Sequence, residues 1–355
     1  MANGFVRALG LMSGTSADGV DAAIITTDGE SVSAFGPRHT VPYAAGLRAR
    51  VLAAMAAGEA SPGLDREVTE ANAAAALAIM AGQHVQLAGL HGQTILHDPL
   101  RGRTVQIGCG ARLAARLGVP VVDQFRVADV AAGGQGAPLV PVFHAALAEG
   151  LGPVAVLNVG GVANVTFVGD GPLLAFDTGP GGALLDDWVR RHTGAPFDAG
   201  GALAGAGQVR HDRLAALLDH PYFNRRPPKS LDRNAFSLAA VESLPAADGA
   251  ATLLAFTVAA IVRAATHASP RRWLVAGGGR HNRALMAALA AVLPAVDPVE
   301  AVGWDGDALE AQAFAFLAVR SQRGLPLSFP GTTGVPVPMP GGTLHLARPS
   351  ETCHL

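Results

Sequence analysis

Lysine is almost absent from this sequence. The 355 residues contain one lysine, Lys229, so 25 of the 26 basic side chains are arginines. A P-loop needs a lysine directly after its glycines to hold a phosphate, and no glycine frame precedes Lys229 in the segment PPKS. The sequence therefore excludes a P-loop, and it excludes a Schiff-base lysine at every position except 229.

Charged side chains and cysteines are also scarce. Charged residues make up 15% of the chain, against about 25% in an average soluble protein. The net charge of −2 and the lack of a basic run argue against a nucleic-acid partner. Cys109 and Cys353 are too few for a disulfide framework and fit a reducing cytosol.

No membrane or targeting segment is predicted. The first ten residues lack the cationic flank and apolar core of a signal peptide. The longest apolar stretch, residues 251–262, is about 12 residues long, and roughly 18 are needed to span a bilayer. We therefore expect a cytoplasmic protein with no membrane partner, long enough for two domains.

The two halves of the chain open in the same way. An apolar strand at 5–12 is followed by a glycine turn and a second apolar strand, and residues 154–168 repeat this pattern. Strands then alternate with helices, which favours a parallel sheet covered by helices. We predict two similar α/β domains, 1–140 and 141–355. Helices are expected at 44–58, 65–82, 110–117, 141–149, 181–193, 246–267, 281–292 and 307–322, and loops at 126–140 and from 324 onward.

Four glycine-rich turns follow apolar strands, at residues 13–21, 158–164, 176–182 and 275–282. Glycine lets backbone N–H groups approach an anion closely, because it has no side chain and reaches positive φ at little cost. Any one of these turns alone is more often a simple tight hairpin. Four turns in matching positions of two repeats favour a phosphate site built from backbone amides and hydroxyls.

The first turn adds polar side chains to its glycines. Ser13, Thr15 and Ser16 supply hydroxyl groups, and Asp18 and Asp21 supply carboxylates. That set suits phosphates together with hydrated Mg²⁺, which takes one or two carboxylates and keeps several waters. The alternative is a hairpin whose carboxylates cap its own backbone.

Other candidates lie where buried strands end or where a helix is otherwise apolar. Asp177 ends the run LLAFD, where partial burial would raise its pKa toward that of a general base; the alternative is a cap on the helix after Pro180. Glu310 shares a helix face with Ala313 and Phe314, so an inward position is open to it, while a surface position is the commoner outcome for such a glutamate. His91, Gln93 and Thr94 end another buried strand, where they can hydrogen-bond a polyol.

These motifs occur together, and in the same order, in a known family. MSGTSADGVDAA, HGQT, DQFRVADVAAGGQGAPLVP, LNVGGVAN, FDTGPGG, VAGGGRHN and DALEAQAFAFLA follow one another as in the anhydro-N-acetylmuramic acid kinases, which the chain resembles from residue 9 to about 334. The first motif is the most specific of the set. The resemblance implies two ribonuclease H-like domains of the actin-like ATPase and sugar kinase superfamily, with the active site in the interdomain cleft.

The resemblance also implies a reaction. ATP and water would convert 1,6-anhydro-N-acetylmuramic acid, a product of cell-wall breakdown, to N-acetylmuramic acid 6-phosphate. Asp177 would be the base that activates water, and Glu310 would assist at the sugar. ATP would contact Gly14, Thr15, Ser16, Ala17, Asp18, Gly19, Val20, Asp21, Asn158, Gly160, Gly161, Asn164, Gly277, Gly278, Gly279 and Asn282, with Mg²⁺ on Asp18 and Asp21; the sugar would contact His91, Gln93, Thr94, Arg126 and Asp129. The family also implies a homodimer.

The chain departs from the family pattern in two places. Gly182 replaces the usual asparagine of FDTGPGN, and residues 229–236 read KSLDRNAF in place of a KSTGRExF-like stretch. The second departure therefore leaves open a kinase for another sugar or small acid. A non-catalytic sensor of anhydro-muropeptides is a further alternative, against which the intact Asp18, Asp21 and Asp177 argue. Because Lys229 lies in the departing stretch, we expect Lys229→Met to leave the chemistry largely intact.

Overall fold

The chain forms two compact units. The structure is a computed structural model and describes residues 4–14, 16–232 and 235–347. Unit 1 comprises Met1–Leu147 and Ala308–Leu355, and unit 2 comprises Ala148–Asp307. This division differs from the expected one, because the last segment of the chain returns to unit 1 instead of staying in the second domain.

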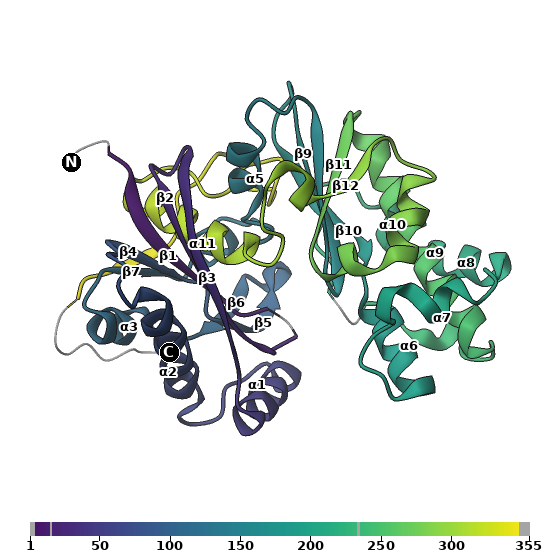
Figure 1. Cartoon of the computed structure of the whole chain (residues 1–355), viewed down its shortest axis with the longest axis horizontal. Helices are drawn as coiled ribbons and strands as arrows, with labels where there is room; N and C mark the ends of the chain where they lie inside the picture. The colour runs from purple at the N-terminus through teal and green to yellow at the C-terminus, as the bar shows by residue number, and fades with distance from the viewer. Residues whose placement is uncertain (1–3, 15, 233–234, 348–355) are drawn as a thin grey trace. The chain divides into compact units, whose positions relative to one another are not determined.

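Unit 1 is built on a six-stranded sheet (Figure 1) in the order β13-β7-β4-β1-β2-β3. The strands are β1 (Val6–Met12), β2 (Gly19–Thr27), β3 (Val32–Pro42), β4 (Leu87–Leu90), β7 (Val121–Asp123) and β13 (Thr343–His345). β1, β2 and β3 form an antiparallel meander, and β4 and β7 run parallel to β1. Strands β5 (Gln93–Asp98) and β6 (Arg103–Ile107) form a separate hairpin.

The helices of unit 1 largely match the expected ranges. They are α1 (Ala45–Ala57), α2 (Leu64–Met80), α3 (Gly110–Leu117), α4 (Val127–Ala131), α5 (Pro141–Leu147) and α11 (Leu309–Gln322). Two predictions of loops were wrong. The glycine-rich segment 126–140 begins with α4, and the tail contains β13, which pairs with β7 through backbone hydrogen bonds that its composition does not reveal.

Strand β1 is apolar from Ala8 to Met12 because both of its faces are buried there. Leu9 and Leu11 pack into a core with α2 residues such as Val68. On the other face, Gly10 pairs with Gly89 of β4, and α11 lies directly on this glycine pair. A Cβ at Gly10 would be 1.8 Å from the Ala311 carbonyl oxygen, and one at Gly89 would be 2.2 Å from the Phe314 carbonyl oxygen. This close approach explains why α11 belongs to unit 1.

Unit 2 repeats the strand order of unit 1. Its sheet runs β10-β9-β8-β11-β12, with β8 (Val154–Val159), β9 (Val162–Val168), β10 (Leu174–Pro180), β11 (Arg272–Ala276) and β12 (Val296–Pro298). Again the first three strands form an antiparallel meander, and the last two run parallel to the first. In each unit the order third-second-first-fourth-fifth is that of a ribonuclease H-like domain, so the expected fold is confirmed.

The helices of unit 2 pack around one long apolar helix. They are α6 (Ala183–Thr193), α7 (Ala202–Gly205), α8 (His211–Leu218), α9 (Ala246–Ala264) and α10 (Arg283–Ala290). The span Ala246–His267, which includes α9, is long and apolar enough to cross a membrane by length and composition alone. However, 67% of its apolar 18-residue stretch is buried within the protein. Residues such as Phe256 and Ile261 belong to the core of unit 2, which is the usual position of such a helix in a packed domain.

Candidate functional site

The first glycine turn joins β1 to β2 and is held by side chains from a neighbouring loop. Ser13 Oγ lies 2.7 Å from Gln93 Oε1 and 2.8 Å from the Gly19 carbonyl oxygen. Gln93 Nε2 donates to the Gly14 carbonyl oxygen at 3.1 Å, and both Ser13 and Gln93 are buried. Gln93, predicted to bind the sugar, is therefore a clamp on the turn that was predicted to bind phosphate.

The other residues of this turn differ in what they can offer a ligand. The side chains of Ala17 and Val20 are fully buried, so these residues can meet a ligand only through their backbone. Ser16 uses its carbonyl oxygen to accept from Arg48 Nη2 at 3.2 Å. Thr15 lies outside the described residues.

The two carboxylates predicted to hold Mg²⁺ already have partners. Asp18 Oδ1 accepts from Arg48 Nη2 at 3.0 Å, yet the Asp18 side chain is 71% exposed. Asp21 Oδ1, on β2, accepts from Thr40 Oγ1 at 2.6 Å. Carboxylate oxygens are hard ligands of the kind that Mg²⁺ prefers, and one or two of them suffice when waters complete the shell. The donor chemistry therefore fits Mg²⁺, with Arg48 in competition for Asp18.

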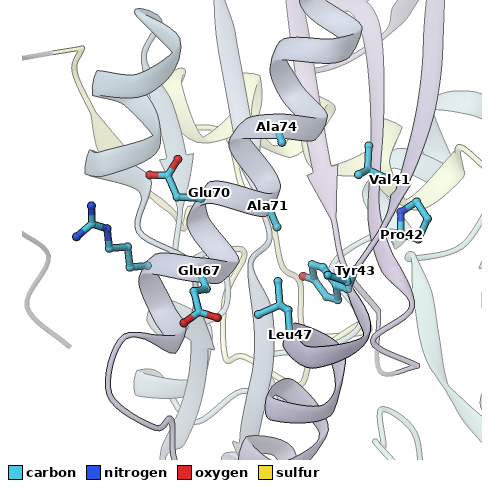
Figure 2. A pocket seen from close by; sticks show the side chains of 10 residues that line it. Val41, Pro42, Tyr43, Leu47, Glu67, Glu70, Ala71 and Ala74 are labelled. Atoms are coloured by element: carbon cyan, nitrogen blue, oxygen red, sulfur yellow. The ribbon is translucent and has the colours of Figure 1, made fainter.

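A cavity of about 410 Å³ lies beside this turn, between the end of β3 with the start of α1 and the side of α2. Figure 2 shows Tyr43 and Leu47 on one side of it and Glu67, Glu70 and Ala71 of α2 on the other. Tyr43 connects the cavity to the turn, because its backbone N–H donates to the Asp18 carbonyl oxygen at 2.9 Å. Sequence reasoning did not find this cavity, since its lining is mostly apolar residues of ordinary helix and strand patterns.

His91 and Arg126, both predicted to bind the sugar, contact each other. Arg126 Nη2 donates to His91 Nε2 at 2.8 Å, and Arg126 Nη1 donates to the Gly136 carbonyl oxygen at 2.7 Å. Burial of the His91 ring, and then the nearby Arg126 charge, hold the pKa of His91 well below its usual range. The neutral imidazole therefore accepts from the guanidinium and fixes its orientation.

Asp129 holds the local loops of unit 1. This carboxylate is 2% exposed. Its Oδ1 accepts from the Gly136 backbone N–H at 2.5 Å, and its Oδ2 accepts from Thr333 Oγ1 at 2.5 Å. Because both of its oxygens accept hydrogen bonds, this carboxylate fixes the 133–136 loop. Thr94, by contrast, is half-buried on β5, where its Oγ1 accepts from Gln106 Nε2 at 3.3 Å.

In unit 2 the second glycine turn joins β8 to β9. Asn158 and Asn164 face each other across this hairpin as a cross-strand pair. The carbonyl oxygens of Gly160 and Gly161 accept from backbone N–H groups at the start of the 181–183 segment, with N–O distances of 2.7 Å from Gly182 and 3.0 Å from Gly181. Two of the predicted phosphate turns thus pack directly on each other.

The space around Gly182, where the chain departs from the family pattern, would admit a side chain. A Cβ added there would meet its nearest neighbours at 3.6 Å, which is ordinary contact. The backbone has φ −82° and ψ −17°, which any residue adopts. The position therefore has room for the asparagine that the family usually carries, and glycine is not required by the local geometry.

The predicted adenosine loop packs on the end of β8. Gly277 has a φ of +73°, and a Cβ there would lie 2.4 Å from Asn158 Oδ1, so only glycine fits. Gly279 approaches Val159 just as closely, at 2.6 Å, whereas Gly278 meets nothing within 4 Å. Asn282 caps α10 by accepting from the Leu285 backbone N–H at 3.0 Å. Gly277 and Gly279 serve close packing, and Asn282 serves a helix terminus.

Asp177 lies on β10, the edge strand of the unit 2 sheet. Its side chain is half-buried, and the Leu231 backbone N–H donates to Asp177 Oδ2 at 2.7 Å. The Asp177 backbone N–H donates to the Lys229 carbonyl oxygen at 2.9 Å, and the Tyr222 hydroxyl donates to the Asp177 carbonyl oxygen. The carboxylate is therefore held by the segment that follows α8, not by capping α6.

Sequence reasoning missed the groups that surround Asp177. Lys229 Nζ donates to the Tyr222 carbonyl oxygen at 3.1 Å and lies 4.4 Å from the centre of the Tyr222 ring. Burial, together with the charges of Arg225 and Arg263, lowers the pKa of Lys229 to about 8. Burial and the negative charge of Asp177 raise the pKa of Tyr222 well above its usual value. The buried tyrosine was the available signal, because a buried Tyr hydroxyl usually has a partner.

Glu310 lies in unit 1, in the first turn of α11. Its side chain is exposed, although Ala313 and Phe314, which share its helix face by spacing, are buried. Of the two positions that the sequence left open, the surface position is therefore the one observed. At a helix start the neighbouring turn is missing on one side, so a residue on the buried face can still reach solvent.

Comparison with known proteins places the chain in a family. Residues 6–345 match the family model described as anhydro-N-acetylmuramic acid kinase. The chain belongs to this family. It is 59% identical to the anhydro-N-acetylmuramic acid kinase of Acidiphilium cryptum (strain JF-5), with 96% of this chain and 98% of that protein covered. It is 57% identical to the protein of the same name from Rhodospirillum rubrum, with 96% and 94% covered.

Membership of the anhydro-N-acetylmuramic acid kinase family makes the chain an enzyme of the kinase class, as its motifs predicted. Several solved structures resemble it remotely. Component A of (R)-2-hydroxyglutaryl-CoA dehydratase from Acidaminococcus fermentans matches at 13% identity and a TM-score of 0.46, with 90% of this chain and 99% of that chain covered. The strand order of each unit, and not this likeness, therefore carries the fold assignment.

Proposed function

We propose that the protein uses ATP and water to convert 1,6-anhydro-N-acetylmuramic acid to N-acetylmuramic acid 6-phosphate, opening the anhydro ring. Family membership supports the substrate. The observation that carries the chemistry is the Asp177 carboxylate, half-buried at the edge of β10 and held by the Leu231 N–H. A fixed carboxylate with restricted solvent contact is suited to take a proton from one bound water.

In the proposed step, Asp177 accepts a proton from the water as the water oxygen bonds to C1 of the sugar. The bond between C1 and O6 breaks, and O6 takes the γ-phosphoryl group, so that ADP leaves. Glu310 assists at the sugar, where its exposed carboxylate can accept hydrogen bonds from ring hydroxyls. Phosphoryl transfer depends mainly on positioning and charge neutralisation, so the protein needs no covalent intermediate.

The turn residues have the following proposed roles. The 14–21 turn and the 158–164 hairpin bind the ATP phosphates, and the 277–282 loop lies at the adenosine. Asp18 and Asp21 hold Mg²⁺, which when bound neutralises the charge of the phosphates. Arg126 pairs with the lactyl carboxylate of the sugar, because a guanidinium oriented by His91 presents a fixed fork to a carboxylate. The residues that support this pocket as buried hydrogen-bonding groups are His91, Gln93 and Asp129. Thr94 is less buried.

The reaction places the protein in the recycling of cell-wall peptidoglycan and in amino sugar breakdown, in the cytoplasm, and the family resemblance favours a homodimer. The decisive experiment is a coupled assay of ADP release with ATP, Mg²⁺ and the anhydro sugar. Sugar-dependent ADP supports the proposal. Turnover only with another sugar would make this a kinase of different specificity, and binding of the sugar without ADP release would make it a sensor.

The role of Asp177 is tested by Asp177→Asn, which keeps the size of the side chain and removes its basicity. We expect kcat to fall by about two to four powers of ten, the usual contribution of a positioned acid–base group, while ATP still binds. Asp187→Asn is the matched control, because Asp187 lies on α6 in the same unit and pairs with Arg190 at 2.9 Å. Near-normal activity of Asp177→Asn would assign Asp177 a structural role only.

A further inference from the structure

The only lysine of the sequence is buried against the candidate base. Lys229 is 6% exposed and Tyr222 is 3% exposed. A buried ammonium is unfavourable unless polar groups receive it. Here it meets the Tyr222 carbonyl oxygen at 3.1 Å and the face of the Tyr222 ring at 4.4 Å. The lysine thus binds a tyrosine at two points, one on its backbone and one on its side chain.

That tyrosine and the lysine's own neighbours hold Asp177 at three points. The Tyr222 hydroxyl donates to the Asp177 carbonyl oxygen. The Lys229 carbonyl oxygen accepts from the Asp177 backbone N–H at 2.9 Å. The Leu231 backbone N–H donates to Asp177 Oδ2 at 2.7 Å. Because β10 is an edge strand, no further strand orders Asp177 from this side, and the 222–231 segment takes that place.

We propose that Lys229 is a positioning residue for Asp177. By tying its own end of the 222–231 segment to Tyr222, it closes the segment into a clamp on the strand edge, and this clamp fixes the Asp177 carboxylate. The catalytic consequence rests on the proposed function, since it matters for turnover only if Asp177 is the base. The earlier expectation for Lys229→Met is thereby reversed.

The kinetic test compares Lys229→Met with Lys229→Arg. A small misplacement of a catalytic group costs up to about a hundredfold in rate. We therefore expect Lys229→Met to lower kcat by about ten- to a hundredfold, with KM for ATP changed by less than about threefold, since an effect confined to the transition state leaves ground-state binding intact. Lys229→Arg keeps a cation that donates to Tyr222 and restores part of the rate.

A pH profile separates this role from a purely structural one. The ammonium of Lys229 lies over the Tyr222 ring and is repelled by the charges of Arg225 and of Arg263 on α9. His267 is also near, and its own pKa is lowered by burial and by the charge of Lys229. As the pH rises through about 8, Lys229 loses its proton and its hold on the Tyr222 ring weakens. We expect an alkaline fall in kcat that disappears in Lys229→Arg, because a guanidinium keeps its proton over this range.

A second measurement does not depend on activity. Amide hydrogen exchange, followed by NMR, reports the N–H groups of Asp177 and Leu231 directly. In Lys229→Met both should exchange at least about tenfold faster, which corresponds to about 1.4 kcal/mol of lost protection. Unchanged exchange at both amides would overturn the proposal, whatever the kinetics.

The two arms also separate this proposal from the proposed function. If Asp177→Asn is inactive and Lys229→Met has normal kcat, Asp177 is the base but Lys229 does not position it. If Asp177→Asn retains activity while Lys229→Met loosens both amides, the clamp exists but Asp177 is not the base. Loss of kcat, faster exchange and partial rescue by arginine together support the positioning role.

Discussion

The packing of α11 on Gly10 gives a sharp test of the fold. Gly10 lies beneath α11, and a Cβ there would be 1.8 Å from the Ala311 carbonyl oxygen, whereas ordinary contact begins at 3.4 Å. Gly10→Ala therefore requires α11 to retreat from the sheet by about 1.6 Å, since protein interiors hold no spare volume. Overpacking of a core typically costs about 1–3 kcal/mol. Because the clash is with helix backbone and not with a flexible side chain, we expect about 3 kcal/mol or more.

The choice of assay follows from where the reporters lie. Trp188, Trp273 and Trp304 all belong to unit 2, so tryptophan fluorescence reports that unit. Unit 1 is followed instead by hydrogen exchange and mass spectrometry of peptides from β1, β4 and α11. In Gly10→Ala these peptides should lose protection, while peptides from β8 and β11 keep it. Activity should also fall, because α11 carries Glu310 beside Ala311.

The matched control is Gly46→Ala. Gly46 lies in α1 and a Cβ there would meet nothing within 4 Å, so we expect stability to be unchanged or raised by up to about 1 kcal/mol, as for glycine-to-alanine changes at compatible sites. If Gly10→Ala lost less than about 1 kcal/mol of unfolding free energy, the close packing of α11 on the glycine pair would be refuted.

Two further outcomes are expected in unit 1. Burial lowers the pKa of His144 from 6.5 to about 3, so the folded state holds it neutral; its stabilising contribution is complete above pH 6.5 and is lost as the pH falls toward 3, by up to about 1.4 kcal/mol per pH unit. Urea unfolding at several pH values between 7 and 5 gives the slope of the unfolding free energy against pH. This slope should be smaller in His144→Gln than in the wild type, and equal slopes would contradict the predicted loss of stability on acidification. Gln93→Leu leaves Gly14 and Ser13 without their buried hydrogen-bond partner, which typically costs about 1–3 kcal/mol. We expect KM for ATP to rise about tenfold. An unchanged KM would show that the turn held by Gln93 does not contribute to ATP binding.

The fold was predictable from the sequence because its strongest signals are local. Apolar strands, glycine turns and alanine-rich helices repeat in the two halves, and the helix ranges were correct to within a few residues for elements such as α2, α3 and α9. Asp177 was also placed correctly in an apolar strand, although β10 does not end at this residue but continues to Pro180. Each of these features depends on neighbours in sequence, which pattern and propensity describe well.

Other features depend on contacts between residues distant in the chain, and these were missed. The return of α11 to unit 1 depends on Gly10 and Gly89 meeting Ala311 and Phe314, and no pattern within the helix reveals that contact. The hydrogen bond from Thr333 to Asp129 likewise joins residues far apart in the chain, so the sequence did not reveal it. The structure shows that several of the predicted site residues also hold loops, while their roles toward a ligand stay predictions.

Lys229 shows why scarcity alone says little about a residue's role. In the sequence it was the only lysine, within a stretch that departs from the family pattern, and it was expected to be dispensable. In the structure the same departing stretch supplies the Leu231 N–H that holds the Asp177 carboxylate, while Lys229 anchors that stretch to Tyr222. This clamp depends on the side chains of Lys229 and Tyr222 and on several backbone groups, so substitutions between Lys229 and the end of the stretch can accumulate while the clamp survives. We therefore expect a substitution of Lys229 to alter the position of the Asp177 carboxylate more than substitutions of the residues that follow it.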